Sequence, residues 1–280
     1  MESRVTRRAV SDVRAVCGSA SPIAATRWLS SLVTHLPECA RARSLSPADR
    51  AWAQSGASFT TPSGAVVSLP AAYSPGAREM YCRNVYLRTG LAMPAKGWVV
   101  DLGANRGLFS IWAAVTGAHV IAVEAQEGFA PLIADLATHN GVAERVHVEI
   151  ALASGVRTSG AKAGVVADDQ RWSTTSHGAP TRPADVSVPQ LMVNYGIDRI
   201  GLIKIDIEGG EFAVLAAGDD LGWLQEVDQV VLEIHHDFGD VPSLIGRLRS
   251  HGFAVELRDN DGRRVAETSR DLSYVYCGRS

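Results

Sequence analysis

The sequence predicts an α/β fold of the Rossmann-like type, with a mostly parallel sheet, an antiparallel C-terminal hairpin and an N-terminal extension of helices and a small hairpin. From residue 98 onward, short runs rich in Val and Ile alternate with amphipathic segments. This alternation is typical of parallel strands covered by helices on both faces. The last two apolar runs, 253–258 and 272–278, flank a polar segment of turn formers at 259–262, which indicates a hairpin.

Residues 1–90 are expected to form the extension and residues 91–280 the main domain. Residues 1–55 mix short apolar stretches with Arg, Ser and Pro, and we interpret them as helical segments. β-branched residues flank a Pro-Ser-Gly turn within 58–70, which predicts a small hairpin. Apolar and aromatic residues recur at helical spacing in 76–90, so we expect a helix there.

The main domain begins with five runs that we interpret as parallel strands. They lie at 98–103, 119–125, 145–152, 201–208 and 228–235. Residues 153–186, between the third and fourth runs, are rich in Gly, Ser, Thr, Asp and Pro and are too polar for a core element. A loop of that length usually serves a functional site.

Bulk properties favour a cytoplasmic protein with a small-molecule partner. The chain carries 27 Lys and Arg against 30 Asp and Glu, which gives no electrostatic reason to expect a nucleic acid or an anionic membrane as partner. Asp12 and Arg14 interrupt what would be the apolar core of a signal peptide, and no apolar run approaches the ~20 residues that cross a bilayer. The four cysteines are widely spaced, which favours reduced thiols. The oligomeric state stays open.

A glycine turn follows the first predicted strand and carries Asp101, Gly103, Asn105 and Gly107. Glycine at 103 and 107 allows the backbone to approach a ligand closely. A dinucleotide-binding fold uses G-x-G-x-x-G to seat a pyrophosphate, whereas the spacing here is G-x-x-x-G. The Asp101 carboxylate would repel a phosphate, and it could hold the ammonium of an amino-acid moiety directly or through water.

The second predicted strand ends in Glu124, where a carboxylate can accept hydrogen bonds from both hydroxyls of a ribose. A ribose and an ammonium without a phosphate are features of S-adenosyl-L-methionine, which we predict as the cofactor. The alternative is a generic glycine turn with an exposed Glu at a strand end.

Three sequence blocks give this chain a resemblance to the FkbM family of S-adenosylmethionine-dependent methyltransferases over most of residues 79–258. They are VVDLGANRGLFS followed by VIAVEA, the segment VSVPQLMVNYGIDRIGLIKIDIEGGEFAVLAAG, and VVLEIHHDF. The resemblance implies a class I methyltransferase sheet and methylation of a hydroxyl on a sugar, a polyketide or another secondary metabolite. The sequence departs from the family pattern at Gly210, where Ala is more usual, and at Ala151, where an acidic residue would contact the adenine.

Acidic and imidazole side chains gather at the predicted strand ends, where ligands bind in open α/β sheets. We expect His235 to be the general base for the acceptor hydroxyl, with Glu233 orienting its imidazole. The alternative for His235 is a partly buried histidine bonded to a neighbouring carboxylate. Asp206 and Glu208 share a face of their strand, which suits substrate orientation or a divalent ion. Their alternative role is charge compensation at a helix N-terminus, together with Glu211.

The remaining candidates would contact the acceptor. We assign this role to Glu208, Glu233, His236 and Trp172, and assign catalysis to His235 and Asp206. His236 also suits a solvated loop, and Trp172 also suits structural packing. Glu79 and Tyr81 are lid candidates, although packing is the simpler role for Tyr81 and surface placement for Glu79.

We expect turnover without a metal ion, because acidic strand ends are common in proteins that bind none. Two other functions remain open on the same fold. One is methylation of a nitrogen or a carboxyl group. The other is a non-catalytic module that binds S-adenosylmethionine after losing its base.

Overall fold

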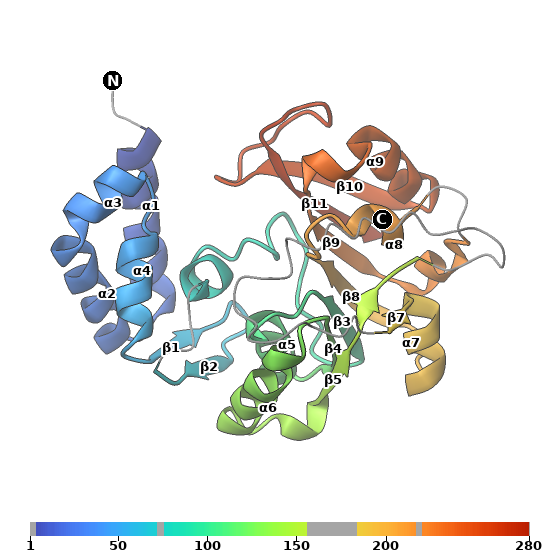
Figure 1. Ribbon diagram of the computed structural model, residues 1–280, viewed down its shortest axis with the longest axis horizontal. Helices are drawn as coiled ribbons and strands as arrows, with labels where there is room; N and C mark the ends of the chain where they lie inside the picture. Colours follow the sequence, from blue (N-terminus) through green and yellow to red (C-terminus); the bar gives the residue numbers. More distant parts are fainter. Residues whose placement is uncertain (1–3, 72–75, 156–183, 217–219, 280) are drawn as a thin grey trace.

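A seven-stranded sheet forms the centre of the computed structural model, which describes residues 4–71, 76–155, 184–216 and 220–279 (Figure 1). Its strands are β3 (Trp98–Leu102), β4 (His119–Glu124), β5 (Val146–Ile150), β8 (Ile200–Ile205), β9 (Gln229–Glu233), β10 (Phe253–Asp259) and β11 (Leu272–Arg279). They follow the order β10-β11-β9-β8-β3-β4-β5. Five neighbouring strands are parallel to one another, namely β5, β4, β3, β8 and β9. Strand β11 runs antiparallel to both β9 and β10. The predicted Rossmann-like sheet with an antiparallel hairpin is confirmed.

The strand order reverses at β3. The chain proceeds outward from β3 to β4 and β5, and then returns to place β8 on the other side of β3. In open α/β sheets, ligands bind beyond the carboxyl ends of the strands at such a reversal point. We therefore expect the ligand-binding site at the carboxyl ends of β3, β4, β8 and β9.

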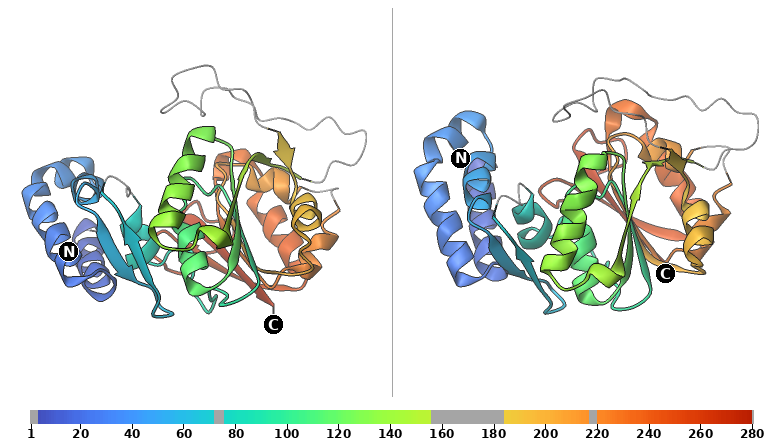
Figure 2. Two further views of the ribbon diagram at one scale, coloured as in Figure 1. Left: turned by 90° about the horizontal axis from the view of Figure 1, so that it is seen from below. Right: turned by 60° about the horizontal axis from the view of Figure 1, so that its bottom comes forward.

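Helices cover both faces of the sheet (Figure 2). One face carries α5 (Leu108–Thr116) and α6 (Ala130–His139); the other carries α7 (Val188–Tyr195), α8 (Glu211–Val214) and α9 (Val241–Ser250). Successive side chains of a strand point to opposite faces. Val99 and Leu202 accordingly join the apolar cluster of α5, and Val100 and Ile203 join the cluster of α7 and α9. The continuous apolar runs of the sequence reflect this burial on both faces.

Short elements connect the main ones. They are the 3₁₀ turns η2 (Glu127–Phe129), η3 (Ala143–Arg145), η4 (Gly222–Glu226) and η5 (His236–Phe238), and the two-residue strands β6 (Leu152–Ala153) and β7 (Asp185–Val186). The pairing of β6 with β7 joins the two ends of the predicted long loop. Trp172 lies between them, outside the described residues.

The N-terminal extension contains the predicted helices and hairpin. They are α1 (Arg4–Ser19), α2 (Pro22–Thr34), α3 (Leu36–Ala42), α4 (Ser46–Ala53), β1 (Ala57–Thr60) and β2 (Val66–Leu69). At the start of α2, the Ser21 side chain accepts a hydrogen bond from the Ala24 N–H, and Pro22 occupies the first turn, where its missing N–H costs nothing. The extension lies beside the α5 face of the sheet (Figure 1).

A buried ion cluster ties the extension together. The Arg78 guanidinium donates to Asp12 of α1 and to Asp49 of α4, and Trp28 of α2 donates to the same Asp49 carboxylate. Tyr81 then connects this unit to the main domain, because its hydroxyl donates to the Leu108 carbonyl at the start of α5. Tyr81 is thus a packing residue of the extension.

The helix predicted for 76–90 is wrong. Only η1 (Arg78–Cys82), a single π-helical turn, forms there, and residues 83–90 are irregular. Asn84 adopts a left-handed conformation with φ of 49°, and its side chain bonds both the N–H and the carbonyl of Leu87. An Asn side chain that replaces backbone partners in this way favours a turn over a helix. The turn directs Tyr86 towards the sheet.

In the parts of the chain that the structure describes, none of the helices combines the length and the apolar character needed to cross a bilayer.

Candidate active site

The ends of β3 and β8 are joined by a buried ion pair between Asp101 and Lys204. The two residues lie opposite each other in the strand register, with 3.0 Å between Asp101 Oδ1 and Lys204 Nζ. Asp101 Oδ2 accepts a hydrogen bond of 2.6 Å from the Ser110 hydroxyl, and Lys204 also donates to the Gly103 carbonyl at 2.9 Å. The Asp101 side chain is fully buried. Each Asp101 oxygen thus has a partner inside the protein, and the expected contact of Asp101 with an ammonium, directly or through water, stays a prediction.

Lys204 keeps its charge in this interior position. Burial alone would lower the pKa of Lys204, but the negative charges of Asp101 and Asp206 outweigh burial and raise it. Because the charge of Asp101 is balanced by Lys204, repulsion from Asp101 no longer argues against a pyrophosphate at the glycine turn. Sequence reasoning missed Lys204, although a lysine inside the apolar run Gly-Leu-Ile-Lys-Ile is an unusual signal.

The glycine turn serves packing inside the protein. Gly103 has φ of +80°, and a Cβ there would lie 1.8 Å from the Asp206 carbonyl oxygen. Gly107 also has φ of +80°, and a Cβ there would lie 3.1 Å from Ile133 of α6. Both glycines thus allow close packing inside the protein, and the approach of a ligand to their backbone stays a prediction. Gly103 brings the end of β3 against the end of β8.

The Glu124 carboxylate is held at the end of β4 by two backbone groups. It accepts hydrogen bonds of 2.8 Å from the N–H of Asn105 and from the N–H of Gln126. Burial raises the pKa of Glu124, and these two bonds partly oppose the rise. Each carboxylate oxygen keeps a free lone pair, so the group fits a ribose with its two hydroxyl donors. Ala151 lies beside it, since its N–H donates to the Glu124 carbonyl at 3.1 Å.

An acidic pair lies at the ends of β8 and β9. The Tyr86 hydroxyl is 2.7 Å from Asp206 Oδ2 and 3.0 Å from Glu233 Oε2. Burial, followed by the negative charge of Asp206, raises the pKa of Glu233 to about 7. Burial and both carboxylates raise the pKa of Tyr86 well above its ordinary value, so the phenol stays protonated. The sequence predicted the two carboxylates but not Tyr86.

The His235 imidazole lies between two other carboxylates. Its Nδ1 is 3.0 Å from Glu211 Oε1, and its Nε2 is 3.4 Å from Glu208 Oε2. Burial would lower the pKa of His235, but the bond to Glu211 and the nearby negative charges raise it to about 9. His235 therefore carries a proton at neutral pH, which counts against its predicted role as the general base. The orienting carboxylate is Glu211 and not, as expected, Glu233.

Glu211 does more than balance a helix end. It is fully buried and accepts hydrogen bonds from the backbone N–H of Gly209 and of His235 as well as from the imidazole. It thereby fixes the turn after β8 to the turn after β9. The alternative interpretation of His235, a partly buried histidine bonded to a carboxylate, describes this arrangement.

The remaining predicted residues are less closely joined to the site. The Glu208 side chain is 81% exposed. His236 donates to the Leu272 carbonyl at the start of β11 and is half-buried, so it is not a solvated loop residue. Contacts of Glu208, Glu233 and His236 with an acceptor stay predictions. Within the described residues, no three His, Cys, Asp or Glu side chains are grouped to hold a metal ion.

The sequence comparison decides the family. Residues 101–255, more than half of the chain, match the model of the methyltransferase FkbM domain. The chain belongs to the FkbM methyltransferase family. The match runs from the end of β3 into β10 and includes the Asp101–Lys204 pair, Glu124 and the acidic pair. Tyr86 lies outside it.

Two relatives each match about two thirds of this chain. The 31-O-demethyl-FK506 methyltransferase FkbM of Streptomyces tacrolimicus is 31% identical over 211 residues, which cover 64% of this chain and 80% of that one. The AMB antimetabolite synthetase AmbE of Pseudomonas aeruginosa is 30% identical over 231 residues, which cover 65% of this chain and 11% of that one. The match with the synthetase thus involves about a tenth of a much longer protein.

Solved structures of similar fold include a methyltransferase and a protein bound to S-adenosyl-homocysteine. The precorrin-6y C5,15-methyltransferase of Geobacter metallireducens has a TM-score of 0.38 at 14% identity and covers 66% of this chain and 82% of that one. TrmK of M. capricolum, in complex with S-adenosyl-homocysteine, has a TM-score of 0.39 at 8% identity and covers 66% and 63%. The strand order, with its antiparallel final strand, is that of the class I methyltransferase sheet.

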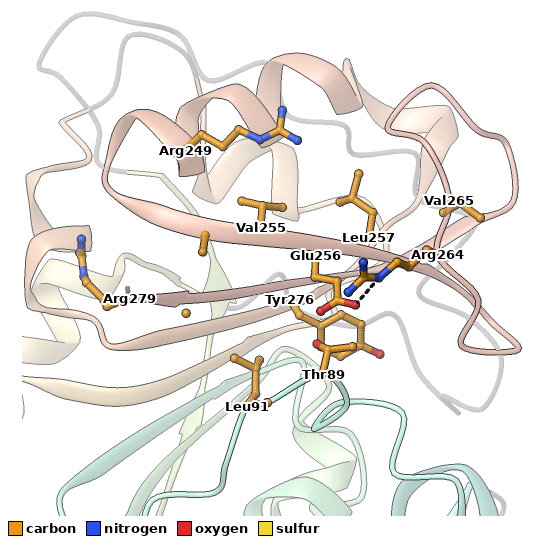
Figure 3. Close-up of a pocket in the computed structure, with 13 residues that line it drawn as sticks. Thr89, Leu91, Arg249, Val255, Glu256, Leu257, Arg264, Val265, Tyr276 and Arg279 are labelled. Carbon is orange, nitrogen blue, oxygen red and sulfur yellow. Dashed lines mark hydrogen bonds and ion pairs between the residues drawn. The ribbon is translucent and has the colours of Figure 1, made fainter.

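A cavity of about 500 Å³ lies elsewhere in the protein, beside β10 and β11 (Figure 3). Its wall includes Thr89, Leu91 and Tyr276, together with an ion pair of 3.1 Å between Glu256 and Arg264. None of the strand-end residues described above lines it. The cavity is therefore separate from the candidate active site.

Proposed function

We propose that this methyltransferase uses S-adenosylmethionine to methylate a hydroxyl oxygen of a small molecule, such as a sugar, a polyketide or another secondary metabolite. The observation that carries the proposal is the placement of Glu124 and the acidic pair at the reversal point of one sheet. Glu124 would hold the ribose, the backbone from Gly103 to Asn105 would lie along the cofactor, and Ala151 would lie near the adenine. When bound, S-adenosylmethionine supplies an electrophilic methyl group on a sulfonium.

The acidic pair favours a hydroxyl acceptor over a carboxylate. An alcohol must lose a proton around the transition state, and a neighbouring carboxylate can receive it. A carboxylate acceptor carries no proton and would be repelled by Asp206 and Glu233. The Streptomyces relative is named for an O-demethyl substrate, which supports the same choice. An amine acceptor is the second candidate, because the negative charge of the pair would attract an ammonium.

Calorimetry tests the cofactor. We expect S-adenosylhomocysteine to bind, and Glu124→Gln to weaken its binding by ~1.5–3 kcal/mol, the range for hydrogen bonds to a charged group. Glu127→Gln removes the same charge from an exposed position on η2 and serves as the matched control. Micromolar binding of NAD without any binding of S-adenosylhomocysteine would contradict the proposal.

Labelled product tests the acceptor. The enzyme, cofactor carrying a ¹³C-methyl group and a metabolite extract are incubated together, and the methylated product is identified by mass spectrometry and methyl-carbon NMR. A methyl ether supports the proposal, whereas a methylamine or a base-labile methyl ester replaces it with one of the alternatives. We also propose turnover without a metal ion, and loss of activity in EDTA that magnesium restores would contradict this.

A further inference from the structure

Tyr86 belongs to the extension, yet its hydroxyl lies inside the acidic pair of the main domain. Tyr86 as a whole is only 6% exposed. It packs edge-on against Phe109 and Tyr274, each with a centroid separation of 5.7 Å, and Lys204 Nζ lies 5.3 Å from its ring centroid. These contacts fix the phenol oxygen 2.7 Å from Asp206 and 3.0 Å from Glu233. The position is too closely packed to be incidental.

One hydroxyl hydrogen cannot serve two ionised carboxylates. A phenol has one hydrogen to donate and lone pairs to accept with. If Asp206 and Glu233 are both ionised, only one of the two short contacts is a hydrogen bond and the other brings two oxygen lone pairs together. If Glu233 carries a proton, it donates to the Tyr86 oxygen while Tyr86 donates to Asp206. Both contacts are then satisfied.

We propose that Asp206, Tyr86 and Glu233 form one proton-accepting unit, in which the two carboxylates are the base and Tyr86 is the positioning residue that makes uptake of a single proton favourable. The inference rests on the proposed O-methylation. As the acceptor O–H bond breaks, its proton forms a new O–H bond on the carboxylate pair, and the electron pair stays on the acceptor oxygen. That oxygen bonds to the methyl carbon, and the electrons of the broken S–CH₃ bond stay on sulfur.

The surroundings suit a base that operates near neutral pH. The titratable side chains that face Glu233 are Asp206, Lys204, Tyr86, His235, Tyr274 and Tyr276. The negative charge of Asp206 disfavours a second negative charge on Glu233 and so raises its pKa. The positive charges of Lys204 and protonated His235 lower that pKa, so one negative charge stays on the pair. The resulting pKa of about 7 lies where a general base is most effective. Two interacting carboxyl groups titrate as a pair, so this value belongs to the unit.

The deciding experiment measures by NMR how the Asp206–Tyr86–Glu233 unit takes up a proton, in the protein without cofactor or acceptor. Carboxyl ¹³C resonances of Asp and Glu are titrated between pH 5 and 9, with Glu233→Gln used for assignment. We expect Tyr86→Phe to lower the apparent pKa of the unit, because the variant loses two hydrogen bonds from the protonated state and one from the ionised state. A tyrosine that only donates to Glu233 would lower the pKa of that group in the wild type, so its removal would raise the pKa.

Turnover supplies the second readout. We expect Tyr86→Phe to lower kcat about tenfold or more and Glu233→Gln to lower it ~10²-fold or more, with the affinity for S-adenosylhomocysteine unchanged. Tyr195→Phe is the matched control, since Tyr195 donates to the carboxylate of Glu149 on β5, outside the site. It should change neither the titration nor kcat.

The two proposals fail in different ways. If the wild type does not bind S-adenosylhomocysteine or transfers methyl groups to nitrogen, the proposed function is wrong whatever the titration shows. If O-methylation occurs but Tyr86→Phe leaves the apparent pKa unchanged or raises it, the shared-proton unit is overturned. Near-normal kcat in Glu233→Gln would overturn it as well.

Discussion

Asp101 of β3 and Lys204 of β8 form an ion pair closed off from solvent, with side chains 0% and 3% exposed and 3.0 Å between Oδ1 and Nζ. Lys204 Nζ also lies 3.7 Å from Asp206 Oδ2. One ammonium therefore connects the glycine turn after β3 with the acidic pair at the ends of β8 and β9. A change at Lys204 should affect both parts of the site.

We expect Lys204→Met to destabilise the protein by ~3–5 kcal/mol, because it leaves the Asp101 charge buried without compensation. Urea unfolding measures the change. The double variant Asp101→Asn/Lys204→Met should recover part of the loss, since it removes the uncompensated charge. Arg249→Met is the matched surface control, because its partner Glu267 and Arg249 itself are both more than a third exposed. A loss of less than ~1 kcal/mol, as for a surface pair, would show that the Asp101–Lys204 pair is hydrated.

Gly103 should tolerate no side chain, because two costs coincide there. A left-handed conformation costs a non-glycine residue ~1–2 kcal/mol, and at Gly103 the added Cβ also meets the Asp206 carbonyl oxygen at 1.8 Å. Gly97 isolates the first cost, since it has φ of +79° and no atom within 4 Å of an added Cβ. We expect Gly103→Ala to lower the free energy of unfolding by at least ~2 kcal/mol more than Gly97→Ala does, as measured by thermal or urea unfolding. Equal losses would mean that the contact with Asp206 relaxes without cost.

The strands of the sheet could be predicted from the sequence because their patterns are local. Runs such as Val-Val-Asp-Leu and Val-Val-Leu-Glu combine β-branched valines with leucine and are buried on both faces, so each run identifies a strand by itself. The helix predicted for 76–90 is wrong because helical spacing there competes with a stronger local signal, the Asn84 turn. The chain turns at Asn84 because the Asn84 side chain takes the place of backbone hydrogen-bond partners.

The candidate site could be predicted only in part, for a related reason. The position of each acidic residue at a strand end is a local property, and Asp206 and Glu233 do lie at the same rim as expected. Their pairing through Tyr86 was not predicted, because spacing along the strands groups Asp206 with Glu208 and Glu233 with His235. Which partner each group takes is decided by contacts between residues far apart in the chain. Tyr86 is 120 residues from Asp206 and 147 from Glu233. Spacing alone carries no information about such contacts.

The stability of the protein should depend on pH through the His235 imidazole, whose pKa is raised by the surrounding carboxylates. The imidazole has a pKa of 6.5 in the unfolded chain and of about 9 in the folded protein, so folding favours its protonated form. Its contribution is therefore fully present below pH 6.5 and is lost as the pH rises through about 9. A shift of this size corresponds to about 3 kcal/mol at full protonation. Urea unfolding between pH 6 and 10 measures the decline.

His235→Gln provides the control, because glutamine can still donate to Glu211 but does not titrate in this range. We expect the decline of stability between pH 6.5 and 9 to be smaller in the variant by about that 3 kcal/mol. NMR of the imidazole carbons should place the pKa of His235 near 9 in the wild type. If His235 acts through Glu211 and not as the base, His235→Gln keeps turnover within about tenfold of the wild type. A measured pKa near 6.5, together with a loss of ~10²-fold or more in kcat, would return the role of general base to His235.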